Sequence, residues 1–227
     1  MRWVTGEDVA TTERAAAQFI AAELSQAIRE RGRAMLAVSG GRTPWSMFDR
    51  LAALGPGWQQ VHLFQVDERI APEGDAARNW TQLLATALAA RIPAAQRHPM
   101  PVESGDPADA AMHYAATLRE FCGEPPVLDV VHLGLGEDGH AASLFPGDEL
   151  LEERVNDVGA SALRNGYRRL TLTLPALGRA RRIVWLALGA AHQPAVARLY
   201  AADRTIPAGR VARGRAIVFT DPAAAPR

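Results

Sequence analysis

The chain has 227 residues, of which 48% are hydrophobic and 22% charged, values that exclude a disordered or collagen-like protein. Its 25 basic and 25 acidic side chains cancel, so no sequence-wide positive charge favours binding to nucleic acid or to an anionic membrane. The sequence contains no lysine, which excludes Schiff-base chemistry and a Walker-type phosphate loop. Cys122 is the one cysteine, which excludes an internal disulfide and a thiolate-rich metal site.

Apolar residues recur with a helical period in some segments and form short continuous runs in others. In chain order, the pattern predicts a helix over 8–31, a strand over 34–38, a helix over 44–54, a strand over 61–66, helices over 77–90 and 107–121, strands over 127–133, 170–174 and 183–188, a helix over 194–201 and a strand over 216–219. Short buried strands separated by amphipathic helices are typical of an α/β fold. We therefore expect a single domain, residues 1–227, with a mostly parallel sheet covered by helices on both faces.

The N-terminal segment gives no indication of export. Residues 1–13 are polar and include Glu7 and Asp8, unlike the basic and then apolar start of a signal peptide. No uninterrupted apolar run approaches the roughly 20 residues of a membrane span. We therefore expect a cytoplasmic protein with no membrane partner.

Polar motifs follow four of the predicted strands. Because the carboxyl ends of parallel strands share one edge of a sheet, these motifs should meet in a ligand crevice. They are residues 39–43, 67–69, 134–140 and 189–192.

The first motif is a glycine-rich turn that leads from a strand into a helix. It consists of Ser39, Gly40, Gly41, Arg42 and Thr43. Its glycines allow backbone N–H groups to approach a ligand, and the helix start adds unpaired donors, so the turn is a candidate phosphate site. The alternative is a tight turn in which Thr43 caps the helix.

The second motif, Asp67-Glu68-Arg69, follows a buried strand directly. The guanidinium of Arg69 matches phosphate geometry, and Asp67 or Glu68 could orient an arginine. The alternative is a solvated run of charges. Farther along the chain, Arg169 begins a strand and is a candidate for phosphate or hydroxyl contact, with a solvated edge as its alternative.

The third motif, residues 134–140, contains three spaced glycines but lacks the strand and acidic residue that a dinucleotide site requires downstream. It ends at His140, whose neutral imidazole can take a proton from water, with Asp138 placed to orient the ring. Backbone N–H groups of the loop, including that of Gly136, are candidates to contact the substrate. The alternative for His140 is a purely structural histidine.

The remaining histidines carry weaker signals. His62 and His132 lie in predicted strands, where we expect them to be packed and hydrogen-bonded. We expect His98 and His113 at the surface. No metal-ligand spacing is present among them.

These motifs resemble those of the 6-phosphogluconolactonases, and their order and spacing match from about Ala34 to Asp221. The motifs that carry the resemblance are 39–44, 67–69 with Asn79 downstream, 134–146 and 169–175. The related glucosamine-6-phosphate deaminases share the first turn and the Asp-Gly-His element. They typically continue with Phe-Asn-Glu-Pro, whereas this chain has Ser-Leu-Phe-Pro over 143–146.

The resemblance implies a Rossmann-like α/β fold of the NagB/RpiA-like kind. It also implies hydrolysis of 6-phospho-D-glucono-1,5-lactone to 6-phospho-D-gluconate in the oxidative pentose phosphate pathway, without metal or organic cofactor. By resemblance, the catalytic histidine is His140, the neighbouring aspartate is Asp138, and the phosphate-binding arginine is Arg69.

One position departs from the family pattern. His192 stands where the family commonly has a phosphate-binding lysine in a Gly-x-x-Lys element. A histidine can donate a hydrogen bond there, but it is only partly charged at neutral pH. This departure leaves a non-catalytic phosphosugar sensor open. A phosphosugar deaminase or isomerase with its site at the same sheet edge also stays open.

Overall fold

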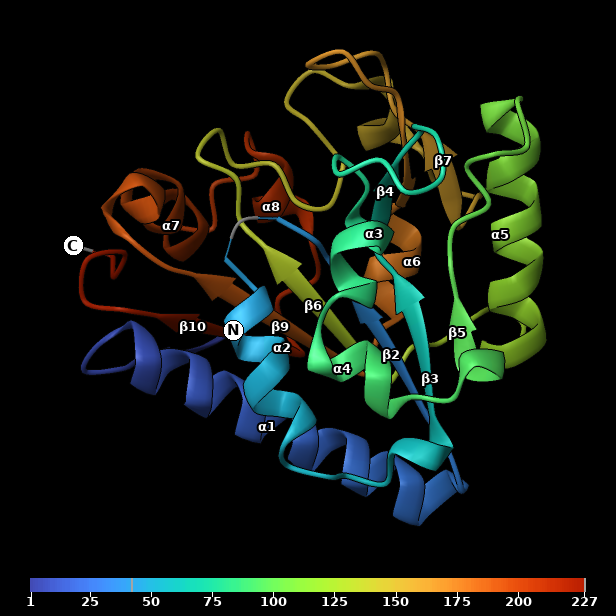
Figure 1. Ribbon diagram of the computed structural model, residues 1–227. Coiled ribbons are helices and arrows are strands. Elements are labelled where there is room, and N and C mark those ends of the chain that lie inside the picture. The colour runs from blue at the N-terminus through green and yellow to red at the C-terminus, as the bar shows by residue number, and fades with distance from the viewer. Residues whose placement is uncertain (42, 227) are drawn as a thin grey trace.

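The computed structural model of the protein describes residues 1–41 and 43–226 (Figure 1). Its main sheet has seven strands in the spatial order β1-β10-β9-β6-β2-β3-β5, and every neighbouring pair is parallel. The strands are β1 (Arg2–Thr5), β2 (Ala34–Val38), β3 (Val61–Gln65), β5 (Arg97–His98), β6 (Val130–Gly134), β9 (Arg182–Ala187) and β10 (Ala216–Thr220).

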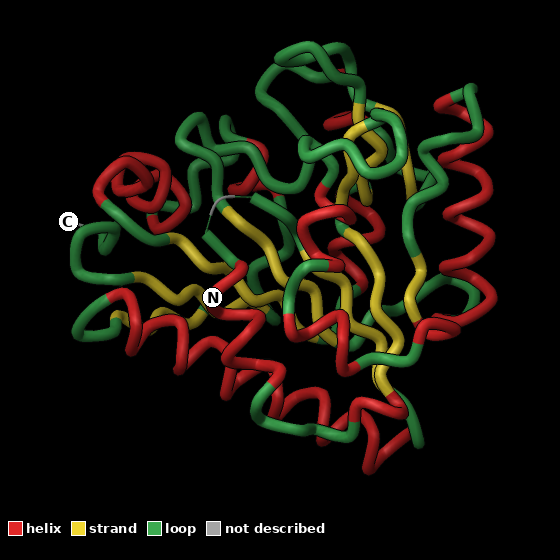
Figure 2. The backbone as a smooth tube through the Cα atoms, in the orientation of Figure 1, coloured by secondary structure: helices red, strands yellow, loops and turns green. Residues whose placement is uncertain are grey.

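Helices cover both faces of this sheet, as predicted (Figures 1 and 2). The α-helices are α1 (Val9–Arg31), α2 (Trp45–Ala52), α3 (Asn79–Leu84), α4 (Ala87–Arg91), α5 (Pro107–Cys122), α6 (Leu174–Arg179), α7 (Gln193–Tyr200) and α8 (Pro207–Arg210). Short 3₁₀ helices are η1 (Trp58–Gln60), η2 (Ala94–Gln96), η3 (Glu149–Glu152) and η4 (Ala190–His192).

The alternation of side chains along each strand divides the core into two layers. In β2, Leu36 and Val38 belong to the apolar cluster that includes residues of α1 and α2. Met35 and Ala37 belong to the opposite cluster, which includes residues of α5 to α8. The central strands are therefore buried on both sides, which accounts for their continuous apolar runs.

Local signals set the ends of the first helix. The Asp8 carboxylate accepts a hydrogen bond from the Thr11 backbone N at 2.7 Å and caps α1. Gly32 ends it in the left-handed conformation with φ of 75°. The predicted bounds of this helix agree with the structure to within a residue.

A second sheet, which the sequence did not predict, stands apart from the parallel one. It is antiparallel, with the order β4-β8-β7, and contains β4 (Asp67–Arg69), β8 (Arg169–Leu172) and β7 (Val158–Ala160). The predicted strand over 170–174 thus lies outside the main sheet, and the charged motif 67–69 is a strand. The pairing places Arg69 directly opposite Arg169.

Two other predicted elements depart further from the structure than by one or two residues at an end. The helix expected over 77–90 is divided into α3 and α4, because the Thr86 hydroxyl caps a new helix at the Ala89 backbone N. The strand expected over 127–133 begins at Val130.

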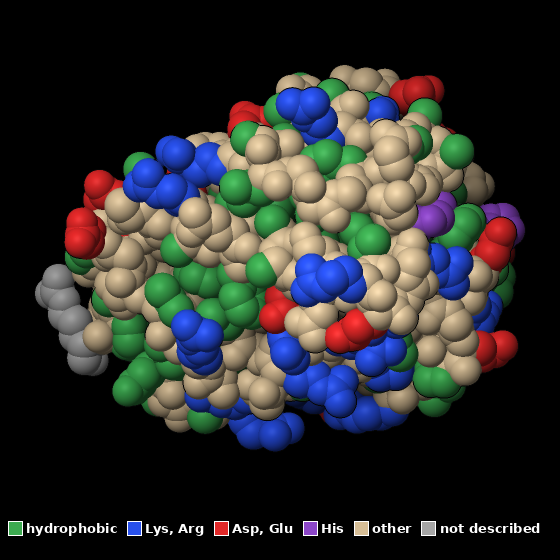
Figure 3. Space-filling model, turned by 90° about the horizontal axis from the view of Figure 1, so that it is seen from below, with side chains coloured by type: hydrophobic (Ala, Val, Ile, Leu, Met, Phe, Trp, Pro, Cys, Tyr) green, Lys and Arg blue, Asp and Glu red, His purple; other side chains and the backbone are tan. Residues whose placement is uncertain are grey.

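Figure 3 shows the molecule from below the view of Figure 1, and arginine side chains gather on this face. Several are paired on the α1 side of the sheet, where Arg182 lies 3.1 Å from Glu23 and Arg31 lies 2.9 Å from the buried Asp129. Such pairs keep positive charge from accumulating there. Within residues 1–41 and 43–226, no helix is long and apolar enough to cross a membrane.

Two histidine predictions are wrong. His98 is buried rather than exposed, because it stacks on Phe64 and lies 3.0 Å from His62, ring nitrogen to ring nitrogen. His132 is buried, but neither of its ring nitrogens has a hydrogen-bond partner in the described part of the chain. Its ring instead packs edge-on against Phe48. Burial lowers the pKa of His98 to about 4 and that of His132 to about 3.

Acid should therefore destabilise the fold through these histidines. The unfolded imidazole titrates near 6.5, so below this pH the unfolded chain binds a proton that native His132 does not. The free energy of unfolding should fall as the pH drops from 6.5 toward 3, by up to about 1.4 kcal/mol per pH unit for each such histidine. Urea unfolding of His132→Leu between pH 4 and 7 should give a shallower slope than the wild type, with the exposed His113→Leu as control. Parallel slopes for wild type and His132→Leu would contradict this account.

Candidate active site

A cavity of about 860 Å³ opens at the carboxyl ends of β2, β6 and β9. Every predicted site residue that the structure describes lines it, and Arg42 lies outside the described residues. The predicted residues in its lining are Ser39, Gly40, Gly41, Thr43, Asp67, Arg69, Gly136, Asp138, His140, Arg169 and His192. The sheet edge thus brings the four polar motifs together.

The buried carboxylate of Asp67 connects three segments of the chain that line this cavity. It accepts hydrogen bonds from the Ser39 hydroxyl at 3.2 Å and from the Ser143 hydroxyl at 2.7 Å. The backbone oxygen of Asp67 accepts a further bond from the Asn79 side-chain amide at 3.0 Å. The turn after β2, the strand β4 and the loop that carries His140 are therefore held in one arrangement.

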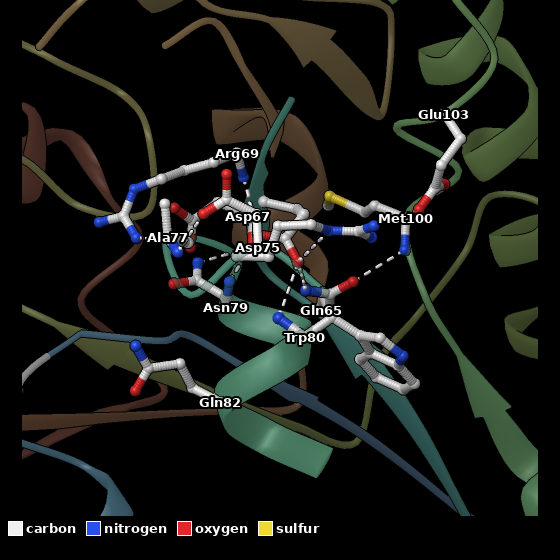
Figure 4. A network of polar contacts seen from close by, with 12 residues as sticks. Gln65, Asp67, Arg69, Asp75, Ala77, Asn79, Trp80, Gln82, Met100 and Glu103 are labelled. Atoms are coloured by element: carbon white, nitrogen blue, oxygen red, sulfur yellow. Dashed lines mark hydrogen bonds and ion pairs between the residues drawn. The ribbon is translucent and has the colours of Figure 1, made fainter. Parts of the chain in front are cut away.

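The neighbouring Glu68 has a structural task. Its carboxylate is fully buried and accepts hydrogen bonds from the backbone N of Asn79, Trp80 and Arg69 and from the side chain of Gln65, all between 2.7 and 2.8 Å. Figure 4 shows these four partner residues around the polar network. Burial raises the pKa of Glu68 above its ordinary value, although these hydrogen bonds oppose the shift. The carboxylate oxygens of Glu68 are thus occupied by N–H groups at the start of α3, and Glu68 does not line the cavity. We therefore assign it no part in the reaction.

The glycine-rich turn needs Gly40 because the backbone passes close to Asn79. A Cβ atom at position 40 would overlap the Asn79 side chain. The adjacent Gly41 has φ of 124°, a conformation that other residues rarely adopt. The turn is thus packed against the start of α3 while it lines the cavity.

Two arginines of the antiparallel sheet reach the cavity. Arg69 donates a hydrogen bond from Nη1 to the Ala77 backbone oxygen. Arg169 is buried and donates from Nη1 to the backbone oxygens of Arg164 at 2.9 Å and Tyr167 at 3.3 Å. Burial, together with the nearby charge of Arg69, lowers the pKa of Arg169.

His140 is held by its neighbour Asp138. Its Nδ1 lies 2.6 Å from Asp138 Oδ1, and the same oxygen accepts the His140 backbone N–H at 3.1 Å. Burial tends to raise the pKa of Asp138, but the hydrogen bonds from His140 and the charge of Arg164 outweigh it and lower that pKa. Since an ionised carboxylate only accepts, the neutral ring carries its proton on Nδ1, which leaves the Nε2 lone pair for the cavity.

The loop around His140 is closely packed. A Cβ atom on Gly136 would overlap the His140 ring, and the Gly136 backbone N donates to the His140 backbone oxygen at 2.9 Å. The His140 ring also lies 4.8 Å from the Phe145 ring, centroid to centroid. A larger residue at position 136 would displace the imidazole.

His192 closes η4 and lines the cavity. Its Nδ1 is buried and has no hydrogen-bond partner among residues 1–41 and 43–226. In that part of the chain, no group of three or more His, Cys, Asp or Glu side chains is placed to hold a metal ion.

Arg164, which no sequence motif pointed to, also lines the cavity, as does Phe145 of the Ser-Leu-Phe-Pro stretch. The Nη2 atom of Arg164 lies 3.3 Å from Asp138 Oδ2. The sequence did contain a hint of Arg164, since Asn165-Gly166 is typical of a two-residue hairpin turn and lies shortly before Arg169, a predicted site residue.

The sequence profile of the family described as glucosamine-6-phosphate isomerases/6-phosphogluconolactonase matches residues 7–219. The chain belongs to this family. A 6-phosphogluconolactonase from Synechocystis sp. is 36% identical over 191 residues, which cover 81% of this chain and 78% of that protein. A solved 6-phosphogluconolactonase from Shewanella baltica is 26% identical with a TM-score of 0.84 and covers 97% of each chain.

The fold alone does not distinguish the two branches of the family. A monomeric glucosamine-6-phosphate deaminase of known structure also has a TM-score of 0.84, over 99% of this chain and 98% of its own, at 17% identity. The choice between the two chemistries therefore rests on the residues of the cavity.

The Glu68 network should be essential for stability. Glu68→Ala removes the acceptor of four buried or partly buried N–H groups, so we expect a loss of about 3 kcal/mol or more in the free energy of unfolding. Urea titration measures this loss, and the exposed Glu73→Ala is the matched control. Equal stability of the two variants would show that the network is dispensable.

Proposed function

We propose that this protein hydrolyses 6-phospho-D-glucono-1,5-lactone to 6-phospho-D-gluconate, a step of the oxidative pentose phosphate pathway. The observation that carries the proposal is the His140–Asp138 pair, 2.6 Å apart, on the wall of a cavity also lined by the glycine-rich turn and Arg69. This arrangement combines a proton acceptor with an anion-binding surface. The names of the 35–40% identical relatives support the same reaction.

The glycine-rich turn forms the phosphate end of the cavity. Gly40 and Gly41 offer backbone N–H groups with no side chain to block a ligand, and Arg69 adds a fixed positive charge. His192 also lines the cavity, and its imidazole can donate one further hydrogen bond there. Together these groups would hold the phosphate while the sugar ring extends toward His140.

His140 acts as the general base at the other end. Its Nε2 takes a proton from water, the oxygen of which attacks the lactone carbonyl carbon. The backbone N–H groups of Gly136, Gly139 and His140 are engaged within the loop, contrary to the expectation for Gly136, so other N–H donors of the cavity wall would stabilise the tetrahedral oxyanion. The bond from that carbon to the ring oxygen then breaks, and the imidazolium returns the proton to the ring oxygen, which gives a hydroxyl group and a carboxylic acid. The acid ionises to the carboxylate by losing its proton to solvent. A single acid–base group of this kind contributes roughly 10² to 10⁴ in rate.

Lactone hydrolysis by the purified protein tests the proposal. Glucose-6-phosphate dehydrogenase can generate the lactone in place, and the spontaneous rate is subtracted. We expect hydrolysis well above that rate. A protein that binds 6-phospho-D-gluconate without accelerating hydrolysis would be a sensor, and ammonia released from glucosamine 6-phosphate would identify a deaminase.

Replacing the base should separate catalysis from binding. His140→Asn should lower kcat by roughly 10² to 10⁴ because no group then accepts the water proton. The dissociation constant of 6-phospho-D-gluconate should change little. The exposed His113→Asn is the control, and near-normal turnover of His140→Asn would remove His140 as the base.

Replacing the phosphate-binding arginine should have the opposite signature. Arg69→Ala removes a charged contact to the phosphate, so we expect KM to rise by about tenfold or more with a smaller change in kcat. Steady-state kinetics of this variant and of the exposed Arg91→Ala provide the comparison. A defect confined to kcat would argue against phosphate binding by Arg69.

A further inference from the structure

We infer that Arg164 binds the carboxylate end of the sugar, so that the cavity recognises both the phosphate and the carboxylate of the opened product. This inference rests on the proposed function. It assigns a specific ligand group, the carboxylate formed from the lactone carbonyl, to a side chain outside the motifs discussed above.

A tight hairpin turn presents Arg164 to the cavity. Arg164 N donates to Tyr167 O at 2.9 Å, and Tyr167 N donates to Arg164 O at 3.1 Å. Between them, Asn165 and Gly166 both have positive φ, 50° and 80°. Two successive positive φ angles are those of a type I′ turn, for which Asn-Gly is strongly preferred.

Arg169 strengthens this turn from inside the protein. Its buried guanidinium donates to the backbone oxygens at both ends of the turn, those of Arg164 and Tyr167. These charge-assisted bonds leave the Arg164 backbone little freedom. Arg164 is therefore placed by its own turn and by a second arginine, unlike a side chain on a loose surface loop.

The side chain of Arg164 is directed to the reacting end of the cavity. Its Cζ lies 4.7 Å from the centroid of the Phe145 ring, and the His140 ring lies 4.8 Å from the same centroid. Arg164 and His140 also share the Asp138 carboxylate, one on each oxygen. A ligand carbon within reach of His140 Nε2 would therefore have this guanidinium close by.

The guanidinium has the capacity to take an additional anion. Its contact with Asp138 is long, 3.3 Å, and both side chains are about 40% exposed, so this ion pair is weak. Guanidinium has further N–H donors that match the two oxygens of a carboxylate. Phe145 covers one face of the group, which leaves its N–H edge for the ligand.

The chemistry of the reaction explains why a cation belongs at this position. The lactone carbonyl is neutral, the tetrahedral intermediate carries an oxyanion, and the product carries a carboxylate. A guanidinium therefore interacts more strongly as hydrolysis proceeds, which is the condition for lowering the barrier. Arg164 would also make the free product a better ligand than an uncharged analogue.

A comparison of two stable ligands tests this assignment without catalysis. D-Glucitol 6-phosphate has the phosphate of 6-phospho-D-gluconate but a hydroxymethyl group where the product has its carboxylate. Calorimetric titration gives the dissociation constants of both ligands for the wild type, for Arg164→Gln and for the exposed neighbour Arg168→Gln. The ratio of the two constants reports the carboxylate preference of each protein.

We expect the wild type and Arg168→Gln to prefer the carboxylate ligand. Arg164→Gln should lose about tenfold or more of this preference while it binds D-glucitol 6-phosphate as the wild type does. That retained binding shows that the variant is folded. An unchanged ratio, or equal losses in both arginine variants, would overturn the role of Arg164. Failure of the wild type to bind either ligand would instead refute the proposed function.

Discussion

The arrangement of the segments that line the cavity depends on one buried carboxylate, that of Asp67. A carboxylate removed from water is costly unless hydrogen bonds replace its hydration, and Asp67 obtains them from the hydroxyls of Ser39 and Ser143. These three residues belong to the turn after β2, to β4 and to the loop that follows His140. The glycine-rich turn and the loop that carries His140 come from distant parts of the chain, and this carboxylate links both of them by hydrogen bonds.

The distribution of charge explains how a chain of zero net charge can offer a site for a ligand that carries both a phosphate and a carboxylate. Over the α1 face, arginines are paired with carboxylates such as Glu23 and Asp129. In the cavity, the cationic side chains of Arg69, Arg169 and Arg164 lie close together, opposed mainly by carboxylates that are already engaged in hydrogen bonds. The net charge of the chain therefore indicates which partners the whole surface can attract, but it does not indicate which ligand binds in this cavity.

The parallel sheet and the composition of the site could be predicted because each rests on a local pattern. Apolar runs mark the strands, and the rule that strand ends share an edge was sufficient to bring His140, Arg69 and Gly40 together. The antiparallel sheet was missed because its strands are short and Asp67–Arg69 has the composition of a loop. The burial of His98 depends on Phe64 and α5, which no local pattern encodes. Arg164 was missed although the Asn-Gly turn that holds it was visible.

The proposed reaction requires one cavity to hold a phosphorylated sugar with its phosphate at the glycine-rich turn and its carbonyl carbon at His140. A crystal structure of the protein with 6-phospho-D-gluconate tests this directly. We expect the phosphate within hydrogen-bond distance of the Gly40–Gly41 backbone and the Arg69 guanidinium, and the carboxylate beside His140 Nε2. A ligand bound in the reverse orientation, or outside this cavity, would contradict the account.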